Sequence, residues 1–312
     1  MPRCPITLDA TPAGTRYSRA GLQTLDARLI EDLHPLALTA AEQLQVAAAQ
    51  ADKISIQGVQ PKLSAVLRVK ERKFEMVDHG GRFILKPCPA EWSEVPANEA
   101  LTMTLARHVG IEVPPHGLVY AADDSLTYFI RRFDRVGRDD KLPVEDFAQL
   151  IGLKRDTKYE SSMERVAEVI RKHCTFPALE NVKLARRMIF NFLTGNEDMH
   201  LKNFSLITRD GNVELSPGYD LLNTTIILGK NAKEETALPI NGKKSKLTRN
   251  DFVRHFFTGR LGIDQKVVAK LLEGMTQAAT TWPEVIRHSF LSTGKQDAYL
   301  KLLTERIARL QA

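Results

Sequence analysis

The spacing of apolar residues divides the chain into a short helical beginning, a strand-rich middle and a long helical remainder. Between about residues 22 and 51, leucines recur at helical spacing, at Leu25, Leu29 and Leu33, and the pattern breaks at His34-Pro35. This part of the chain is therefore predicted to form one or two short helices.

The apolar residues that follow, up to about residue 135, occur in short runs bounded by Gly, Pro and charged turns, which is typical of strands. The predicted strands are residues 63–69, 83–86, 117–120 and 126–132. One helix interrupts them, and its apolar side chains share a face. It is predicted over residues 98–109.

Helical periodicity dominates after Pro143, with one exception. The predicted helices cover residues 163–173, 182–193, 252–257, 267–279 and 298–310. The exception is a short β-hairpin at residues 204–215, which turns at Asp210-Gly211. A group of strands followed by a group of helices predicts an α+β fold of two lobes, a small lobe with a mixed sheet and a larger helical lobe. The expected divisions are an N-terminal helical segment at 1–54, the small lobe at 55–143 and the helical lobe at 144–312.

Composition adds mainly exclusions to this picture. The chain has 312 residues, of which 43% are hydrophobic, so it can bury a substantial core. Its apolar stretches are shorter than the roughly 18 residues that a bilayer span requires, and Met1-Pro2-Arg3-Cys4-Pro5 does not resemble a signal peptide. We therefore expect a cytoplasmic protein with no membrane partner. Three widely spaced cysteines indicate reduced thiols, and a net charge of +6 mildly favours a polyanionic partner such as ATP, nucleic acid or an acidic protein surface.

The strongest chemical signal lies around the predicted hairpin. Asp198 and Asn203 flank a polar loop between an apolar helix and the first strand of the hairpin, and Asp220 follows its second strand. Because a hairpin returns the chain to its starting point, we expect Asp220 to lie near Asn203. Phosphoryl transfer requires a carboxylate that orients or deprotonates the attacking hydroxyl, together with oxygen ligands for Mg²⁺. Asp198 is the candidate base and Asn203 and Asp220 are the candidate ligands, although such residues also serve simply as turn and cap residues.

A kinase also needs a cation that anchors the nucleotide phosphates. Lys86 ends an apolar predicted strand, where burial would be costly without an anionic partner, and Glu99 could provide that partner. The alternative is a strand-end lysine that reaches solvent. Residues 55–64 form a polar segment ahead of the first strand, and Gly58 is its single glycine. Without a GxGxxG pattern this segment is a weak phosphate-binding signal.

Several short stretches between about residues 50 and 260 occur in the order found in one known family. They are Ser55-Ile-Gln-Gly-Val-Gln-Pro-Lys-Leu-Ser64, Phe83-Ile-Leu-Lys-Pro87, Asn98-Glu99, Arg132-Phe-Asp-Arg135, Glu145-Asp146 with Gln149, Gly152-Leu153, Lys158-Tyr159-Glu160, Asp198-Met-His-Leu-Lys-Asn203 and Pro217-Gly-Tyr-Asp220. Together they resemble the HipA-like toxin serine/threonine kinases of bacterial toxin–antitoxin modules. The resemblance implies a two-lobed, protein-kinase-like fold and ATP and Mg²⁺ as cofactors.

The same resemblance assigns roles to individual residues. It implies that Asp198 is catalytic, that Asn203 and Asp220 bind Mg²⁺, and that Lys86 and His200 contact ATP. It places further nucleotide contacts in the loop over the phosphates, in the adenine-facing hinge and beside the metal ligand, at Gln57, Gly58, Val59, Gln60, Lys62, Arg131, Arg132, Phe133 and Tyr219.

Ser55 matches the serine that these kinases autophosphorylate, which lowers their activity. A phosphate there would add nearly two negative charges beside a loop that meets the triphosphate of ATP, and would thus oppose nucleotide binding. The alternative is an ordinary turn or cap serine.

The resemblance also implies partners. The family phosphorylates aminoacyl-tRNA synthetases, so one of these is the expected protein substrate, and the expected outcome is growth arrest. Only residues 1–54 precede Ser55, which resembles the short HipT-like form. In that form a separate small protein resembles the missing N-terminal subdomain, and a helix-turn-helix antitoxin completes the module. DNA would be reached only through the antitoxin. The hinge departs from the family in having Arg131 where an acidic residue is common, but contacts made by its backbone would survive this change.

Two other functions remain open from the residues alone. A small-molecule phosphotransferase of the aminoglycoside or choline type uses a comparable Asp, Asn and Asp arrangement, and a non-catalytic co-repressor of a toxin–antitoxin module needs none of this chemistry. The basic run at residues 242–246 could face an acidic target or a phosphate, although a solvated loop is the simpler interpretation.

Overall fold

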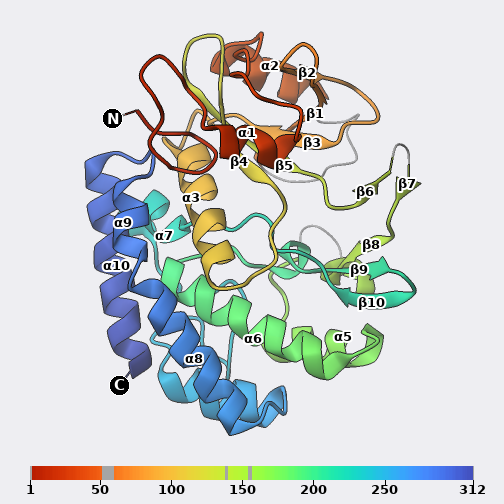
Figure 1. Cartoon of the computed structure of the whole chain (residues 1–312). Helices are drawn as coiled ribbons and strands as arrows, with labels where there is room; N and C mark the ends of the chain where they lie inside the picture. Colours follow the sequence, from red (N-terminus) through yellow and green to blue (C-terminus); the bar gives the residue numbers. More distant parts are fainter. Residues whose placement is uncertain (1, 51–59, 138–139, 154–156, 312) are drawn as a thin grey trace. The chain divides into compact units, whose positions relative to one another are not determined.

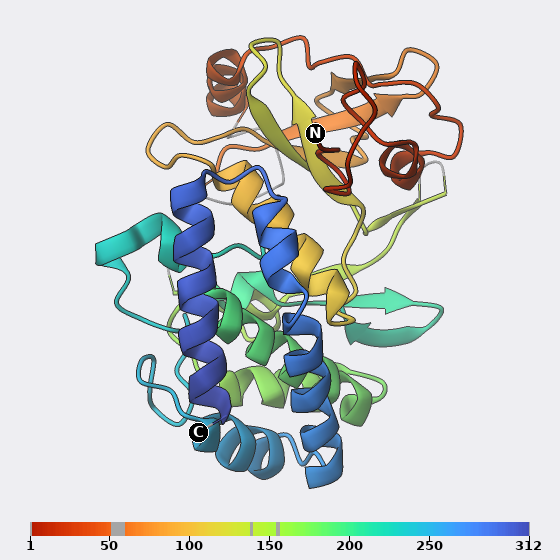
Figure 2. The same cartoon turned by 60° about the vertical axis from the view of Figure 1, so that its left-hand side comes forward.

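The computed structural model describes residues 2–50, 60–137, 140–153 and 157–311, which form two compact units (Figures 1 and 2). The first unit comprises residues 1–101, 114–139 and 287–291, and the second comprises residues 102–113, 140–286 and 292–312. Helix α3 (Val95–His108) contributes residues to both. None of the helices in the described residues is long and apolar enough to cross a bilayer.

A five-stranded sheet organises the first unit. Its strands are β1 (Leu63–Arg68), β2 (Lys73–Met76), β3 (Phe83–Lys86), β4 (His116–Tyr120) and β5 (Leu126–Arg131), in the order β2-β1-β3-β5-β4. Every pair in this sheet is antiparallel, so the expectation of a mixed sheet is wrong. The physical reason is that β1–β2 and β4–β5 are joined by short turns, which allow only antiparallel pairing, and β5 separates β3 from β4.

The segment before the sheet packs into the same core. Helices α1 (Arg19–Leu25) and α2 (Ala40–Gln50) supply apolar side chains that are buried together with residues of β1, β3 and β5. The buried Gln43 side chain is satisfied because the Thr127 hydroxyl donates a 3.0 Å hydrogen bond to it. At Gly117 a Cβ atom would lie 2.9 Å from Cα of Ile6, so the close approach of the N-terminal segment to β4 requires glycine.

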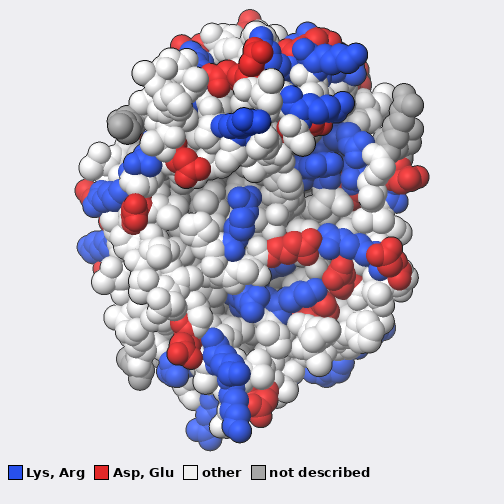
Figure 3. Space-filling view, viewed as in Figure 1, with Lys and Arg blue, Asp and Glu red and all other residues white. Residues whose placement is uncertain are grey.

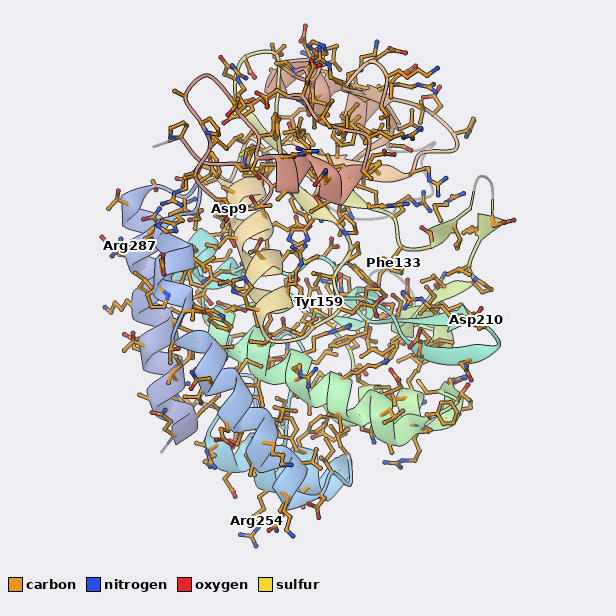
Figure 4. All side chains as sticks on the ribbon, in the orientation of Figure 1. Asp9, Phe133, Tyr159, Asp210, Arg254 and Arg287 are labelled. Carbon is orange, nitrogen blue, oxygen red and sulfur yellow. The ribbon has the colours of Figure 1, made fainter. Side chains whose placement is uncertain are left out.

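The second unit contains the predicted hairpin. Strands β9 (Ser205–Arg209) and β10 (Asn212–Leu215) turn at Asp210 and Gly211, which have φ of +48° and +79° (Figure 4 labels Asp210). Strand β8 (Val144–Asp146) pairs with β9 and makes a three-stranded antiparallel sheet, of which the sequence predicted two strands. Three residues are too few to display the alternation that identifies a strand.

Helices make up most of the second unit. They are α4 (Phe147–Leu150), α5 (Met163–His173), α6 (Pro177–Thr194), η1 (Leu201–Asn203), α7 (Thr224–Leu228), η2 (Gly229–Asn231), η3 (Asp251–Arg260), α8 (Gln265–Ala279), α9 (Trp282–Arg287) and α10 (Thr293–Gln311). Helix α5 begins and ends where the sequence predicted, because Ser162 caps its first turn by accepting from the Arg165 N–H at 3.3 Å. The predicted helix at 252–257 lies within η3, which is a π-helix. Helix α10 packs on α6 (Figure 2).

The remaining short strands are β6 (Arg135–Val136) in the first unit and β7 (Asp140–Lys141) in the second. The predicted boundary between residues 54 and 55 lies outside the described residues. Both expected lobe boundaries stay predictions.

Candidate active site

The loop that carries Asp198 begins at a glycine that the fold requires. Helix α6 ends at Thr194 and is capped by Gly195, which has a left-handed φ of +67°. A Cβ atom at this position would lie 2.4 Å from Leu302 and 2.8 Å from the Thr225 hydroxyl oxygen. The carbonyl oxygen of Gly195 accepts hydrogen bonds from the Thr225 N–H at 3.1 Å and from the Thr224 hydroxyl at 3.1 Å. The start of the loop is therefore fixed to the first turn of α7.

Hydrogen bonds within the loop bring Asp198 and Asn203 together. The Asn203 side-chain amide donates to the carbonyl oxygen of Asp198 at 2.8 Å, and the His200 N–H donates to the same oxygen at 2.8 Å. The Asp198 N–H in turn donates to Oδ1 of Asn196 at 3.1 Å. Three hydrogen bonds thus hold the backbone around the candidate base, and none of them uses its carboxylate.

The segment that precedes Asp220 is tied to the same loop. The hydroxyl of Tyr219 donates to the carbonyl oxygen of Lys202 at 3.0 Å and lies 2.7 Å from the hydroxyl of Ser205. The Ser216 N–H donates to the carbonyl oxygen of Ser205 at 2.9 Å. The two segments therefore lie side by side, as the hairpin argument predicted. Asp220 has a φ of +54°, a conformation that Asp tolerates better than most residues.

A buried arginine forms a hydrogen bond with the backbone of the segment that precedes Asp220. The Arg187 side chain is 3% exposed, and its guanidinium donates to the carbonyl oxygen of Ser216 at 2.7 Å. Burial lowers the pKa of Arg187 to about 10, which still leaves it charged at neutral pH. The sequence did not predict a role for Arg187, because an arginine in a helix gives no signal of its burial.

The charges around the loop act in opposite directions on His200. Burial lowers the pKa of its imidazole, and Lys158 acts in the same direction, whereas the carboxylates of Asp198 and Asp220 oppose the shift. His200 is therefore favoured as the neutral ring at pH 7. The ring of Tyr159 packs edge-on against it, with centroids 5.0 Å apart.

Two contacts of this site were not predicted. The Tyr159 hydroxyl donates to Oδ1 of Asp198, and Lys202 forms a 2.7 Å ion pair with Asp146. Asp146 also caps α4 in a reciprocal capping box with Gln149. The D-x-x-Q spacing of that box was a sequence signal that could have placed Asp146 at a helix start, but nothing in the sequence connects it with Lys202.

In the first unit, the predicted pairing of Lys86 with Glu99 is confirmed. Lys86 Nζ lies 2.5 Å from Oε1 of Glu99, and the two side chains are 2% and 0% exposed. The ammonium also lies 5.4 Å from the ring centroid of Tyr128. A strand-end lysine that reaches solvent is thereby excluded.

The structure gives the backbone bonds, ion pairs or burial of the other residues that were predicted to contact nucleotide. Arg131 and Arg132 donate their backbone N–H groups to the carbonyl oxygens of Pro115 and Arg82, each at 2.8 Å. The guanidinium of Arg132 makes two hydrogen bonds to Asp134, at 2.9 and 2.7 Å. Phe133, labelled in Figure 4, lies in the turn after β5. Gln60 and Lys62 are half-buried, whereas Ser55, Gln57, Gly58 and Val59 lie outside the described residues.

Several surface charges of the second unit form ion pairs. Around the β9–β10 hairpin, acidic and basic side chains are intermingled (Figure 3). Arg209 forms ion pairs with Glu112 and Glu214, at 3.0 and 3.3 Å. In the basic run, Lys243 pairs with Asp251 at 2.9 Å and Lys244 with Glu234 at 3.4 Å. Two of the three lysines of the run therefore form ion pairs within the fold.

The candidate ligands Asn203 and Asp220 suit Mg²⁺ that is also bound by a nucleotide better than a metal ion bound by protein alone. Across the described residues, no three His, Cys, Asp or Glu side chains are grouped so as to hold a metal ion. Asn203 uses its amide nitrogen in the bond to Asp198, which leaves its amide oxygen available as a ligand. One carboxylate and one amide oxygen fit Mg²⁺, which commonly takes one or two protein ligands and completes its shell with phosphate oxygens and water.

The fold and the loop together define an α+β, protein-kinase-like protein. The HipA-like C-terminal domain family matches residues 54–282, and the chain belongs to this family. A predicted kinase of Haemophilus influenzae is 29% identical over 284 residues, which cover 82% of each chain. The serine/threonine-protein kinase toxin HipA of Shewanella oneidensis is 25% identical over 259 residues, or 77% of this chain and 58% of that protein.

Solved structures agree on the fold. A chain of the HipA, HipB and operator DNA complex of Shewanella oneidensis superposes with a TM-score of 0.66 and 22% identity, covering 98% of this chain and 76% of that one. The proinflammatory kinase CtkA of Helicobacter pylori superposes with a TM-score of 0.58 and 15% identity, covering 82% of this chain and 91% of that one. The predicted kinase-like α+β fold class and family are thereby confirmed.

Proposed function

We propose that this chain is a serine/threonine protein kinase that transfers the γ-phosphoryl group of ATP to a protein hydroxyl. The observation that carries the proposal is the joining of the Asp198–Asn203 loop to the Asp220 segment through the Tyr219 hydroxyl. The candidate base and the two candidate metal ligands belong to the segments that this hydrogen bond joins. Membership of a family with kinase-named relatives supports the same chemistry.

Each residue takes one role in this mechanism. Asp198 accepts the proton of the attacking hydroxyl, while Asn203 and Asp220 would hold Mg²⁺, which neutralises charge on the phosphate oxygens. The hydroxyl oxygen forms a bond to the γ-phosphorus, the bond from that phosphorus to the bridging oxygen breaks, and ADP leaves. Lys86, held by Glu99, would anchor the nucleotide phosphates in the first unit. His200 would contact the nucleotide as a neutral imidazole, since burial lowers its pKa.

The nucleotide contacts of Gln57, Gly58, Val59, Gln60, Lys62, Arg131, Arg132, Phe133 and Tyr219 remain part of the proposal. The hydroxyl of Tyr219 is already engaged by Lys202 and Ser205, so any contact that it makes with nucleotide would come from its ring or backbone. The proposal also includes autophosphorylation of Ser55, which would lower the activity of the kinase.

We further propose that the kinase acts as the toxin of a toxin–antitoxin module. The resemblance to toxin kinases supports this role, as does the structural likeness to a protein solved with HipB and operator DNA. The proposed substrate is an aminoacyl-tRNA synthetase, and the proposed partners are a helix-turn-helix antitoxin and a small protein resembling the N-terminal subdomain. DNA would be contacted only through the antitoxin.

Transfer of labelled phosphate from ATP tests the catalytic proposal. Asp198→Asn and Asp220→Asn should each lower transfer to protein by about 10²–10⁴-fold, because each removes a carboxylate that the reaction needs. Asp210→Asn is the matched control, since it makes the same change in charge at the exposed hairpin turn and should leave transfer intact.

Transfer that persists in both site variants would refute the proposal. Label on a small alcohol such as choline, with none on protein, would instead favour a small-molecule phosphotransferase. Growth arrest that is equal for the native chain and Asp198→Asn would favour a non-catalytic co-repressor.

A further inference from the structure

Tyr159 makes a contact with Asp198 that the proposed mechanism does not use. Its hydroxyl donates to Oδ1 of Asp198, the candidate base (Tyr159 is labelled in Figure 4). The ring packs edge-on against His200 at 5.0 Å and an interplanar angle of 86°. The neighbouring Lys158 places its ammonium 5.0 Å from the Tyr159 ring centroid and accepts, through its carbonyl oxygen, a 3.3 Å hydrogen bond from the Leu201 N–H. The segment is thus attached to the loop at several points.

The chemistry of this contact matches that of a substrate hydroxyl. In kinases the catalytic aspartate accepts a hydrogen bond from the hydroxyl that attacks phosphorus. The Tyr159 hydroxyl likewise donates a hydrogen bond to the carboxylate of Asp198. A hydrogen bond to a carboxylate is among the stronger ones, so it holds the side chain in place.

The exposure of the ring indicates from which side the carboxylate is reached. Tyr159 is 41% exposed, whereas Met199, His200 and Asn203 of the loop are buried. A protein substrate arrives from solvent, and Tyr159 is the solvent-exposed partner of Asp198. Burial and the bond to Asp198 both raise the pKa of Tyr159, so its phenol remains protonated at neutral pH and continues to donate.

We propose that the Tyr159 hydroxyl occupies the place of the acceptor hydroxyl in the resting enzyme, and that a protein substrate must displace it from Asp198 before transfer. This inference rests on the proposed role of Asp198 as the base. It makes Tyr159 a residue that determines acceptor specificity. An acceptor with enough contacts elsewhere can displace the phenol, whereas water gains too little to do so, and wasteful hydrolysis of ATP is suppressed.

The variant Tyr159→Phe tests this directly, because it keeps the ring on His200 and removes only the hydroxyl. If the contact is closed about 90% of the time, its loss raises the apparent affinity for an acceptor about tenfold. With the full chain and MgATP, we expect phosphate release to water to rise about tenfold. With dephosphorylated casein as a generic acceptor, we expect KM to fall about tenfold while kcat changes by less than about twofold.

Two further variants serve as checks. Tyr159→Leu also lacks the hydroxyl and should raise hydrolysis in the same way, which covers the case in which Tyr159→Phe folds poorly. Tyr299→Phe removes a buried hydroxyl that lies 3.1 Å from that of Thr102, and it should leave hydrolysis unchanged. Thermal unfolding of each variant verifies that it is folded during the assay.

Three outcomes would overturn the inference alone. If kcat and the rate of ATP hydrolysis both fall in Tyr159→Phe, Tyr159 positions Asp198 for the reaction. Unchanged hydrolysis and KM would mean that the phenol does not compete, and phosphate found on Tyr159 would make it an acceptor itself. Native transfer in Asp198→Asn would refute the proposed function and the inference together, so the two failures are distinguishable.

Discussion

The buried pair of Lys86 and Glu99 allows a quantitative test of the first unit without any assay of activity. The two side chains are 2% and 0% exposed and their charged atoms lie 2.5 Å apart. Lys86→Met keeps most of the side-chain volume but leaves the Glu99 carboxylate buried without its cation. Removing one partner of a buried ion pair typically destabilises a protein by about 3–5 kcal/mol.

Replacing both partners should cost less than the two single changes added together. In the double variant Lys86→Met/Glu99→Leu no charge remains buried, so the desolvation penalty disappears along with the attraction. We expect a coupling free energy of at least about 2 kcal/mol between the two positions. For a unit of this size, a loss of 3–5 kcal/mol corresponds to a fall in melting temperature of about 10–20 °C.

Urea and thermal unfolding of the native chain, both single variants and the double variant measure these quantities. Arg165→Met is a matched control, because Arg165 pairs with Glu168 on the surface, where both side chains are more than half exposed, and its loss should change stability little. Additive single changes, or a cost below about 1 kcal/mol for Lys86→Met, would show that the pair is not buried as described. Lys86→Met should also abolish nucleotide binding if Lys86 anchors the phosphates, a separate readout.

Two further predictions concern the second unit. Gly195→Ala should lower the unfolding free energy by more than about 2 kcal/mol and reduce phosphoryl transfer, because a Cβ atom would lie 2.4 Å from Leu302 in a left-handed backbone. Gly274→Ala is the control for thermal unfolding. A Cβ atom at Gly274 would lie in open space within α8, so this change should not destabilise the protein. Asp251→Asn should cost about 2 kcal/mol at pH 7. Burial would raise the pKa of Asp251, but hydrogen bonds from Thr248 and the contact with Lys243 outweigh it and hold that pKa below its usual value. The stabilisation is therefore present above about pH 4 and is lost as the pH falls through the depressed pKa, so the two unfolding curves should converge in acid. A difference that is independent of pH would contradict this.

The sequence predicted the secondary structure best where local signals agreed. Helix α5 was placed correctly because an amphipathic run coincides with the Ser162 cap, and the β9–β10 hairpin because Asp210-Gly211 suits a turn. Strand β8 was missed because it is three residues long, and its place is set by pairing with β9. The mixed sheet was wrong because strand direction depends on which strands become neighbours, which local patterns do not contain.

The residues of the candidate site were predicted from the sequence, whereas most of their contacts were found only in the structure. Residue type, spacing and the expected hairpin predicted Asp198, Asn203 and Asp220 as candidates, because the chemistry of phosphoryl transfer restricts which residue types can serve. The Lys86–Glu99 pair was predicted because a buried lysine requires an anion. Those choices follow from residue type and spacing, which the sequence contains in full.

The tertiary structure alone decided how these residues are held. The Tyr219 hydroxyl joins the loop to the Asp220 segment, and Tyr159 donates to Asp198 from 39 residues upstream. Asp146 pairs with Lys202 across 56 positions. Such partners depend on distances that arise only when distant segments pack together, and neither hydrophobic period nor motif spacing encodes them. The sequence determined which side chains are candidates for the proposed reaction, and the packing determined which partners hold them in place.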